Sequence, residues 1–335
     1  KLLWLVSTPS PHSHRAPLRM QRWRRTASAL VRVAAALAAL CVAALSSRPL
    51  AAVPSVRCST AAARTRPPSP RRQRGRQPAP ATSDPAFRWL GRVLPVRLGD
   101  VLDAGTGPDS LKWLASCQAT SITGVTACTG MHATVTDEVA EYLDQSVDRV
   151  MVGNWMDRQL LAGRSFDVVL ADYLLGSVDH FAPHFQFDLL RRLSAFLRPN
   201  GWLAIIGKEP EDLAADDAAS RLVLDADALR DASMSLGHQR PYREMPRWWV
   251  AERLRGLGLK IHQTKLFPRL VTKEKVLRQL AWAEEELEKV PHGSLRAGLL
   301  SHLEDLRAQV HASADIGRGH PFGQDYALLV QRSAA

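Results

Sequence analysis

The sequence predicts an α/β fold: a doubly wound, mostly parallel seven-stranded sheet with helices on both faces, plus a C-terminal helical insertion. Three observations support it. Strand-like and helix-like segments alternate from residue 100 to 207, as βαβ units require. A turn with two glycines follows the first strand. The second half is rich in amphipathic helices and closes on an apolar strand.

The strands are short segments that are β-branched or continuously apolar, which suits strands buried on both faces. We expect them at 100–105, 121–127, 148–154, 166–173, 202–207, 259–267 and 325–331. The helices are segments whose apolar residues recur on one helical face. We expect them at 109–116, 130–143, 185–197, 222–236, 246–257, 273–290 and 294–311, with a helix-ending turn at Pro199-Asn200-Gly201.

The turn after the first strand lies in "VLDAGTGPDSLKWLA", residues 101–115. Ligands of open parallel sheets bind at the carboxyl ends of the strands, where the strand order reverses. Glycines at 105 and 107 let a ligand approach the backbone, and the helix after Pro108 presents free N–H groups.

Three interpretations of this turn compete. A dinucleotide site requires G-x-G-x-x-G and an acidic residue about 20 residues further on. Ser110 occupies the third glycine position, and the second strand ends in "VTACTGM" without an acid, which disfavours a nicotinamide-dependent reductase. A purely structural turn and a site for another nucleotide stay open.

The third interpretation comes from a series of motifs in order. "LDAGTG" resembles the first motif of class I S-adenosylmethionine-dependent methyltransferases, (D/E)-x-G-x-G at a strand end. "FDVVLADYLLG" resembles their fourth-strand motif, and "LSAFLRPNGWLAIIG" is similar to their helix, turn and fifth strand. The resemblance covers residues 98 to 208 and implies a Rossmann-like methyltransferase fold with S-adenosyl-L-methionine as cofactor.

The resemblance also implies the cofactor-binding residues. Asp103 would order the loop and hold the amino group of the methionine portion, while Gly105, Thr106 and Gly107 would cup the ligand.

One position departs from the family pattern. The family usually carries an acid at the end of the second strand to bind the ribose, whereas this chain has Thr126 and Cys128 there. A hydroxyl makes a weaker bond than a carboxylate, so a catalytically degenerate, cofactor-binding protein stays an alternative. After the third strand, Asn154 and Trp155 lie where the family reads the adenine. Trp155 is expected either to stack on the purine or to fill the core.

The acceptor side is expected near the end of the fourth strand. Asp172, Tyr173 and His180 are the candidate catalytic residues, because they follow the strand that ends beside the transferable methyl group in the family. Tyr242 and Arg243, between a loop proline and a helix, are candidates for substrate binding. The expected acceptor is a small molecule, and no metal is expected.

The net charge of +11 does not indicate nucleic-acid binding. Residues 1–83 contain 15 of the 44 Lys and Arg and no acid, so the remaining 252 residues, with 29 basic and 33 acidic side chains, have a formal charge of −4. Two of the four cysteines lie in this leader, and the spacing of Cys117 and Cys128 fits neither a disulfide framework nor a zinc site.

We interpret residues 1–85 as a targeting leader with a disordered basic segment, and 86–335 as a methyltransferase-like domain with the helical insertion at 267–322. Within the leader, a positive region precedes the 13-residue apolar run 33–45, which is too short to span a membrane. This signal-like segment and the Arg-, Ser- and Pro-rich stretch after it favour a bipartite plastid leader. A secretory signal peptide with a basic linker is the alternative. We expect no stable membrane span in the mature chain, and a homodimer could form through the C-terminal helices.

Overall fold

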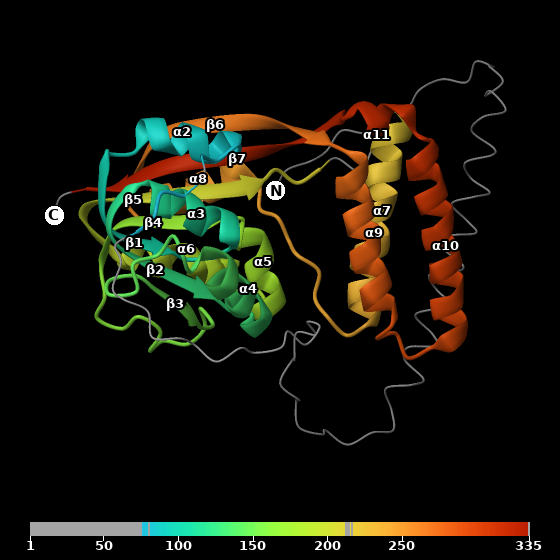
Figure 1. Cartoon of the computed structure of the whole chain (residues 1–335), viewed down its shortest axis with the longest axis horizontal. Helices are drawn as coiled ribbons and strands as arrows, with labels where there is room; N and C mark the ends of the chain where they lie inside the picture. Colours follow the sequence, from blue (N-terminus) through green and yellow to red (C-terminus); the bar gives the residue numbers. More distant parts are fainter. Residues whose placement is uncertain (1–75, 80, 212–214, 216, 334–335) are drawn as a thin grey trace, which may run out of the picture. The chain divides into compact units, whose positions relative to one another are not determined.

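The computed structural model describes residues 76–79, 81–211, 215 and 217–333 (Figure 1). The predicted signal and transit segments therefore lie outside the described residues, and of the predicted leader only 76–79 and 81–85 are described. No helix in these described ranges is both long and apolar enough to cross a membrane.

Within the described part of the chain, seven strands form one sheet in the order β3-β2-β1-β4-β5-β7-β6. The first five run parallel, and β7 runs antiparallel to both of its neighbours. The predicted seven-stranded, mostly parallel sheet is thus confirmed. Its strands are β1 (Arg97–Asp103), β2 (Gln118–Thr126), β3 (Arg149–Val152), β4 (Phe166–Asp172), β5 (Leu197–Lys208), β6 (Leu259–Val271) and β7 (His320–Arg332).

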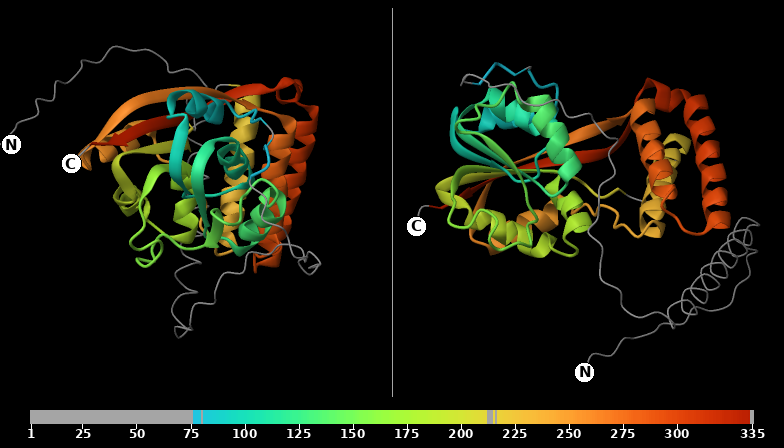
Figure 2. Two further views of the ribbon diagram at one scale, coloured as in Figure 1. Left: turned by 60° about the vertical axis from the view of Figure 1, so that its left-hand side comes forward. Right: turned by 60° about the horizontal axis from the view of Figure 1, so that its bottom comes forward.

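Helices cover both faces of the sheet (Figure 2). Successive residues of β4 serve opposite faces: Val168 packs with one set of helices and Val169 with the other. The first set is α2 (Pro85–Val93), α3 (Pro108–Ser116) and α4 (Thr129–Val139). The second set is α5 (Leu174–Phe181), α6 (Gln186–Ala195) and α8 (Arg247–Gly256). This is the doubly wound arrangement that the alternating segments predict.

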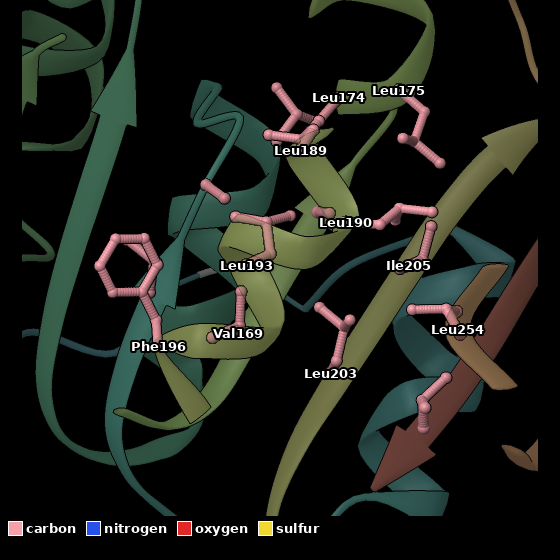
Figure 3. Close-up of a cluster of buried hydrophobic side chains, with 14 of the residues drawn as sticks. Val169, Leu174, Leu175, Leu189, Leu190, Leu193, Phe196, Leu203, Ile205 and Leu254 are labelled. Atoms are coloured by element: carbon pink, nitrogen blue, oxygen red, sulfur yellow. The ribbon is translucent and has the colours of Figure 1, made fainter. Parts of the chain in front are cut away.

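The packing of α6 shows how the helical pattern specifies a face. Leu189, Leu190 and Leu193 are at most 1% exposed and lie against Val169 and Leu203 of the sheet (Figure 3). Each such leucine removes a full aliphatic side chain from water, about 2 kcal/mol of favourable transfer free energy. The same cluster includes Leu254 of α8, so both helices are held to one face of the sheet.

A bundle of helices stands beyond the sheet, where β6 and β7 extend toward it (Figure 1). Between these strands lie α9 (Lys273–Leu287), α10 (Gly293–Ala312) and α11 (Ala314–Arg318). A second segment, α7 (Ala218–Leu236), joins them from between β5 and α8. Leu280, Leu303 and Val310 are fully buried in the core that these helices share.

Three predicted helix ends are wrong. Helix α4 ends at Val139 rather than at 143, and α9 ends at Leu287 rather than at 290. Helix α6 ends at Ala195, and Leu197 already begins β5, because the carbonyl of Phe196 accepts a hydrogen bond from the N–H of Phe166. Pro199-Asn200-Gly201 therefore lies inside β5, where the pairing register with β4 shifts. The helices α2, α5 and α11 were not expected from the sequence.

The last residues of the predicted leader are attached to the fold. The guanidinium of Arg76 contacts both carboxylate oxygens of Asp148, at 2.8 and 2.5 Å, and donates to the carbonyl of Ala119. Asp148 also accepts from the backbone N–H of Ile122 at the start of the buried part of β2. Removing one partner of a buried ion pair is strongly destabilising, so Arg76 is part of the folded unit.

Candidate active site

The point where the strand order reverses lies between β1 and β4. From β1 the chain builds outward through β2 and β3, and then returns to place β4 on the other side of β1. Asp103 and Asp172 end these two strands at the same edge of the sheet. This is the position at which open α/β sheets bind their ligands.

Asp103 orders the glycine turn through hydrogen bonds to its own neighbours. Its Oδ2 accepts from Thr106 Oγ1 at 2.5 Å and from Ser110 Oγ at 2.6 Å. Ser110 Oγ in turn accepts from the backbone N–H of Gly107. Burial raises the pKa of Asp103 to about 6, although both hydroxyl bonds oppose the shift. Its other oxygen, Oδ1, is buried and has no hydrogen-bond partner among the described residues.

The two glycines of the turn have different structural roles. A Cβ at Gly105 would lie 2.9 Å from Cβ of Leu174 and 3.4 Å from the carbonyl of Asp172, so this glycine lets the turn pack against the start of α5. A Cβ at Gly107 would meet nothing within 4 Å. Gly107 therefore faces open space at the start of α3, where a ligand can approach the backbone.

Trp155 and Asn154 support this region from the loop after β3. Trp155 is 4% exposed, and its Nε1 donates to the carbonyl of Ala104 at 2.9 Å. Its ring packs in the core beside Phe196 rather than presenting a face to a purine. Asn154 donates from Nδ2 to the carbonyl of Phe181, which ties this loop to the end of α5.

Just after β2, Cys128 caps the following helix, and Thr126 at the strand end hydrogen-bonds to Cys128. Thr126 Oγ1 accepts from the N–H of Cys128 at 3.3 Å, and Cys128 Sγ accepts from the N–H of Met131 at the start of α4. Both side chains therefore already accept a backbone hydrogen bond. The strand end carries no carboxylate, as the sequence indicates.

Asp172 ends β4, Tyr173 follows it directly, and both lie beside the turn. Burial, and then the charge of Asp103, raises the pKa of Asp172 well above its ordinary value. Its Oδ1 is buried and unpartnered within the described part of the chain. Tyr173 has a left-handed backbone, with φ 45°, at the start of α5 and is 37% exposed. Burial raises its pKa too, and its hydroxyl interacts with Asp325.

Of the remaining predicted residues, His180 lies on α5, and Tyr242 and Arg243 lie on the loop before α8. His180 Nδ1 is 2.7 Å from the carbonyl of Arg240, and its ring meets the edge of Tyr242. Arg243 extends into solvent, with its side chain 68% exposed and 3.6 Å from Asp179. The structure thus brings Tyr242 and Tyr173 to one cavity, whereas His180 is held by backbone and Arg243 points outward.

That cavity has a volume of about 620 Å³ and lies between the carboxyl edge of the sheet and the bundle. Strand ends, the loop before α8 and the helices α7 and α9 contribute its walls. Its polar and aromatic lining includes Asp84, Tyr173, Lys208, Asp227, Arg230, Tyr242, Glu244, Phe267, Arg269, Gln279, Trp282 and Asp325. Among the described residues, no cluster of three His, Cys, Asp or Glu is placed to hold a metal ion.

Two residues of the cavity, Lys208 and Asp325, were not expected from the sequence. Glu244 lies next to the predicted pair Tyr242 and Arg243, and burial raises its pKa to about 7. Lys208 ends β5 and pairs in register with Asp325 near the start of β7. A charged residue next to an apolar strand segment was the sequence feature that could have indicated Lys208 and Asp325.

A family model described as a methyltransferase domain matches residues 71–262, more than half of the 335-residue chain. The match ends within β6, so α9, α10 and β7 lie beyond it. A search of curated protein sequences gave no significant match.

Three solved structures illustrate the similarity in outline. A candidate methyltransferase from Bacillus halodurans has 13% identity and a TM-score of 0.49, over 74% of this chain and 99% of that one. The YcgJ protein from Bacillus subtilis has 15% identity and a TM-score of 0.48, over 75% and 98%. A methyltransferase from Thiobacillus denitrificans, solved with S-adenosyl-L-homocysteine, has 14% identity and a TM-score of 0.43, over 76% and 93%.

Proposed function

Because the chain belongs to the methyltransferase-domain family, we propose that it transfers a methyl group from S-adenosyl-L-methionine to a small molecule bound in the cavity beside β4. The single observation that carries this proposal is the glycine turn at the topological switch point. There, Asp103 keeps one buried oxygen unpartnered and Gly107 faces open space.

The residues of the turn fit the cofactor. Asp103 Oδ1 is a buried acceptor in need of a donor, which the ammonium group of the methionine portion provides. Gly107 gives room for close approach to the backbone at the start of α3. When bound, the cofactor supplies an electrophilic methyl group on a sulfonium that leaves as a neutral thioether.

The chain's own contribution is to position the acceptor and to exclude water from it. Tyr173 extends from the end of β4 into the cavity, one residue beyond Asp172. Leu174 fixes this position because it packs against Gly105 of the turn. The acceptor and the methyl donor are thereby brought to adjacent sides of the same short segment.

The size of the cavity supports a small-molecule acceptor. A volume of about 620 Å³ lies within the ~300–1,000 Å³ usual for small-ligand sites. Aromatic rings of Tyr173, Tyr242, Phe267 and Trp282 line it together with charged groups.

A binding comparison tests the cofactor. We expect S-adenosyl-L-methionine to raise the melting temperature of the full chain at micromolar to millimolar concentration, and NADPH to leave it unchanged. Stabilisation by NADPH alone would favour the nicotinamide-dependent reductase.

The hydroxyl of Thr126, where the family usually carries an acid, supports a second candidate: a cofactor-binding protein without turnover. Thr126 Oγ1 already accepts from Cys128, which leaves less capacity for a ribose. Cofactor binding without formation of S-adenosyl-L-homocysteine on a broad acceptor panel would favour this candidate.

We also propose that the chain acts in a plastid, because its leader combines a signal-like apolar run with an acid-free, Arg-rich stretch. Import of a fluorescent fusion of residues 1–85 into plastids tests this address, and retention in the secretory pathway would contradict it. A homodimer through the C-terminal helices is tested by the solution mass of the full chain.

A further inference from the structure

Among the described residues, the cavity beside β4 is lined by five cations and four carboxylates. The cations are Lys208, Arg230, Arg269, Lys275 and Arg278, and the carboxylates are Asp84, Asp227, Glu244 and Asp325. A ligand gains most from the charges that the chain itself leaves unpaired. The partners of each group therefore decide which ligand the cavity favours.

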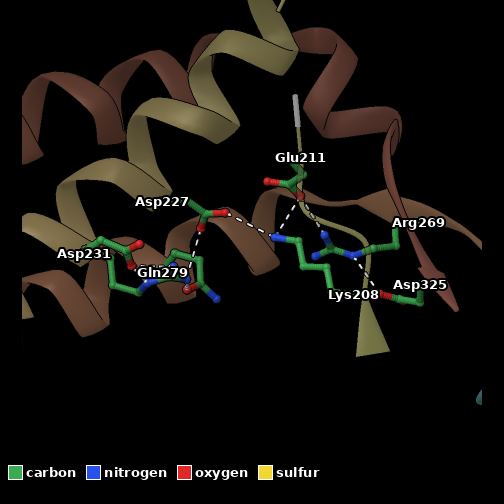
Figure 4. A network of polar contacts seen from close by, with 8 residues as sticks. Lys208, Glu211, Asp227, Asp231, Arg269, Gln279 and Asp325 are labelled. Carbon is green, nitrogen blue, oxygen red and sulfur yellow. Dashed lines mark hydrogen bonds and ion pairs between the residues drawn. The ribbon is translucent and has the colours of Figure 1, made fainter. Parts of the chain in front are cut away.

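Two of the cations are neutralised by carboxylates at the ends of the strands (Figure 4). Lys208 Nζ lies 2.8 Å from Glu211 and 3.6 Å from Asp227. Arg269 Nη1 lies 2.8 Å from the same Glu211, and its Nε lies 3.5 Å from Asp325. Both cations thus already contact two carboxylates each.

A third cation, Arg230 of α7, is neutralised in the same way. Its guanidinium lies 3.1 Å from Asp227 and 2.7 Å from Asp231, and it donates to Gln279. It also lies over the ring of Trp282, 5.6 Å from the centroid. Arg230 is therefore satisfied within the fold.

The other two carboxylates of the lining, Asp84 and Glu244, add little free negative charge. Asp84 Oδ1 accepts from the N–H groups of Ala86 and Phe87 at the start of α2. Glu244 accepts from the backbone N–H of Lys208, and burial raises its pKa to about 7. Near neutral pH, Glu244 is therefore only partly ionised.

Two cations of α9 remain without a carboxylate partner. Arg278 makes no ion pair and no side-chain hydrogen bond within the described ranges. Lys275 Nζ donates to the carbonyl of Leu270 at 2.9 Å. Glu274, one turn before Arg278, instead makes a side-chain hydrogen bond with Thr272. The charges left for a ligand are therefore positive and lie on the bundle side of the cavity.

These two cations belong to one face of α9. Lys275, Arg278, Gln279 and Trp282 recur at the three- and four-residue spacing of a single helical face, and all of them line the cavity. Side chains three residues apart on a helix start about 5–6 Å from each other, so a single anionic group can contact both cations. The planar guanidinium of arginine matches a carboxylate or phosphate with two parallel hydrogen bonds.

Aromatic side chains lie next to the two cations. Trp282 follows Arg278 by one turn of α9, and its ring meets that of Tyr242 edge-on, with 5.5 Å between the centroids. Tyr173 and Phe267 line the same cavity. Aromatic rings bury apolar groups well, so they suit the body of a ligand whose charged end lies on α9.

We propose that the cavity binds a small organic acid, whose anionic group lies on Lys275 and Arg278 and whose apolar body packs against Tyr242 and Trp282. This inference rests on the proposed methyl transfer and specifies the class of its acceptor. Helix α9 lies beyond the family match, which ends at residue 262, so the two cations are not part of the matched domain.

The test uses matched probes with the full chain saturated in S-adenosyl-L-homocysteine, and isothermal titration measures their binding. The probes are 3-phenylpropionate, its neutral amide and the cation 3-phenylpropylamine. We expect the acid to bind about tenfold more tightly than the amide or the amine. A further probe, 2-phenylethyl phosphate, distinguishes the two anionic groups: tighter binding than the acid assigns a phosphate, and weaker binding assigns a carboxylate.

Charge variants of α9 locate the anionic group. Arg278→Gln should weaken binding of 3-phenylpropionate about tenfold, and Lys275→Gln should weaken it less, because an ammonium lacks the bidentate geometry. Arg278→Glu should lose the acid and bind 3-phenylpropylamine more tightly than wild type does. Both residues are exposed, so the variants should fold. The matched control is Arg296→Gln on α10, an exposed arginine outside the cavity, which should bind as wild type.

Several outcomes would overturn this assignment. An amide that binds as tightly as the acid would do so, as would wild-type affinity for the acid in both Arg278→Gln and Lys275→Gln. An equal loss in Arg296→Gln, or no binding of the acid by a chain that binds S-adenosyl-L-homocysteine, would also contradict it. Failure to bind S-adenosyl-L-homocysteine would instead count against the proposed function, and the acid and the amide titrated without it would still test the cavity.

Discussion

The glycine turn and the cavity wall are built in opposite ways. The turn is local: Asp103, Thr106 and Ser110 satisfy one another within eight residues of sequence. The cavity wall is assembled from distant segments: Arg269, for example, contacts Glu211, 58 positions away in the sequence, at 2.8 Å.

Because they are built differently, the glycine turn and the cavity wall offer different groups to a ligand. The turn leaves one acceptor, Asp103 Oδ1, close to the uncrowded backbone of Gly107. These two features suit a cofactor whose structure does not vary. The wall belongs to a cavity whose bundle side, α9, lies outside the family match, and it leaves Glu244 Oε2 without a hydrogen-bond partner among the described residues. The glycine turn therefore lies within the family match, whereas the side of the cavity that α9 forms lies beyond it.

The largest expected effect is at the turn. Asp103→Ala should weaken S-adenosyl-L-methionine binding roughly 100-fold, because it removes a buried, charge-assisted acceptor worth about 2–3 kcal/mol. Asp109→Ala removes an exposed carboxylate from the same segment and should leave the affinity within about twofold. Titration calorimetry measures both. An equal loss of cofactor affinity in the two variants would mean that the turn contributes only its overall negative charge and no specific contact.

The buried carboxyl of Glu244 predicts that the free energy of unfolding depends on pH, by about 3 kcal/mol in all. The pKa of Glu244 is about 7 when folded and near 4.5 when unfolded, so the folded chain holds a proton that the unfolded chain loses between these values. This contribution to stability is present below pH 4.5 and is lost as the pH rises to 7. Lys208, Arg269 and Asp325 are the charges that face Glu244 from β5, β6 and β7.

Glu244→Gln does not titrate. Relative to wild type, we expect it to gain about 2 kcal/mol of stability between pH 5 and pH 8, measured by urea unfolding. Parallel stability curves for the two proteins would show that Glu244 is solvated rather than buried.

The two glycines separate packing from ligand approach. Gly105→Ala should cost about 2 kcal/mol and lower the melting temperature by about 5 °C, because its methyl group meets Leu174 at 2.9 Å. Gly107→Ala meets no atom within 4 Å and should unfold as wild type, while it binds the cofactor about tenfold more weakly. Calorimetric unfolding and titration check the pair. The reverse pattern would place the ligand beside Gly105.

The smallest effect is expected at Trp155. Trp155→Phe keeps the buried ring but loses the hydrogen bond from Nε1 to Ala104, which is worth about 1 kcal/mol. Chemical denaturation should show this loss, with a smaller change in cofactor affinity. A much larger loss of affinity than of stability would indicate that the ring touches the cofactor directly.

The fold could be predicted from the sequence because strands, helices and turns are marked by periodic apolar residues and by short motifs of neighbouring residues. Alternating apolar segments indicate strands such as β4 and β5, and the glycines at 105 and 107 mark the turn between β1 and α3. The predicted end of α6 was wrong by two residues because Leu197 pairs with Phe166 of β4, and this strand pairing overrides the helical pattern.

The acceptor side could be predicted only in part. Tyr173 and Tyr242 were found from their places after a strand and a loop, and both line the cavity. The partnership of Glu244 with Lys208 and Asp325 depends on which strands and loops meet in space, and no pattern in the sequence records that. Ser110, which breaks the dinucleotide motif, donates a hydrogen bond to Asp103. Only the positions of the two side chains in the structure show this role.

The central claim is that the turn at the end of β1 holds the methyl donor, and titration of the full chain with S-adenosyl-L-methionine tests it most directly. The account predicts one site per chain, with an affinity in the micromolar range that falls roughly 100-fold in Asp103→Ala. It also predicts weaker binding below about pH 6, where Asp103 takes up a proton. No heat of binding at millimolar cofactor, or the same affinity in Asp103→Ala, would contradict it.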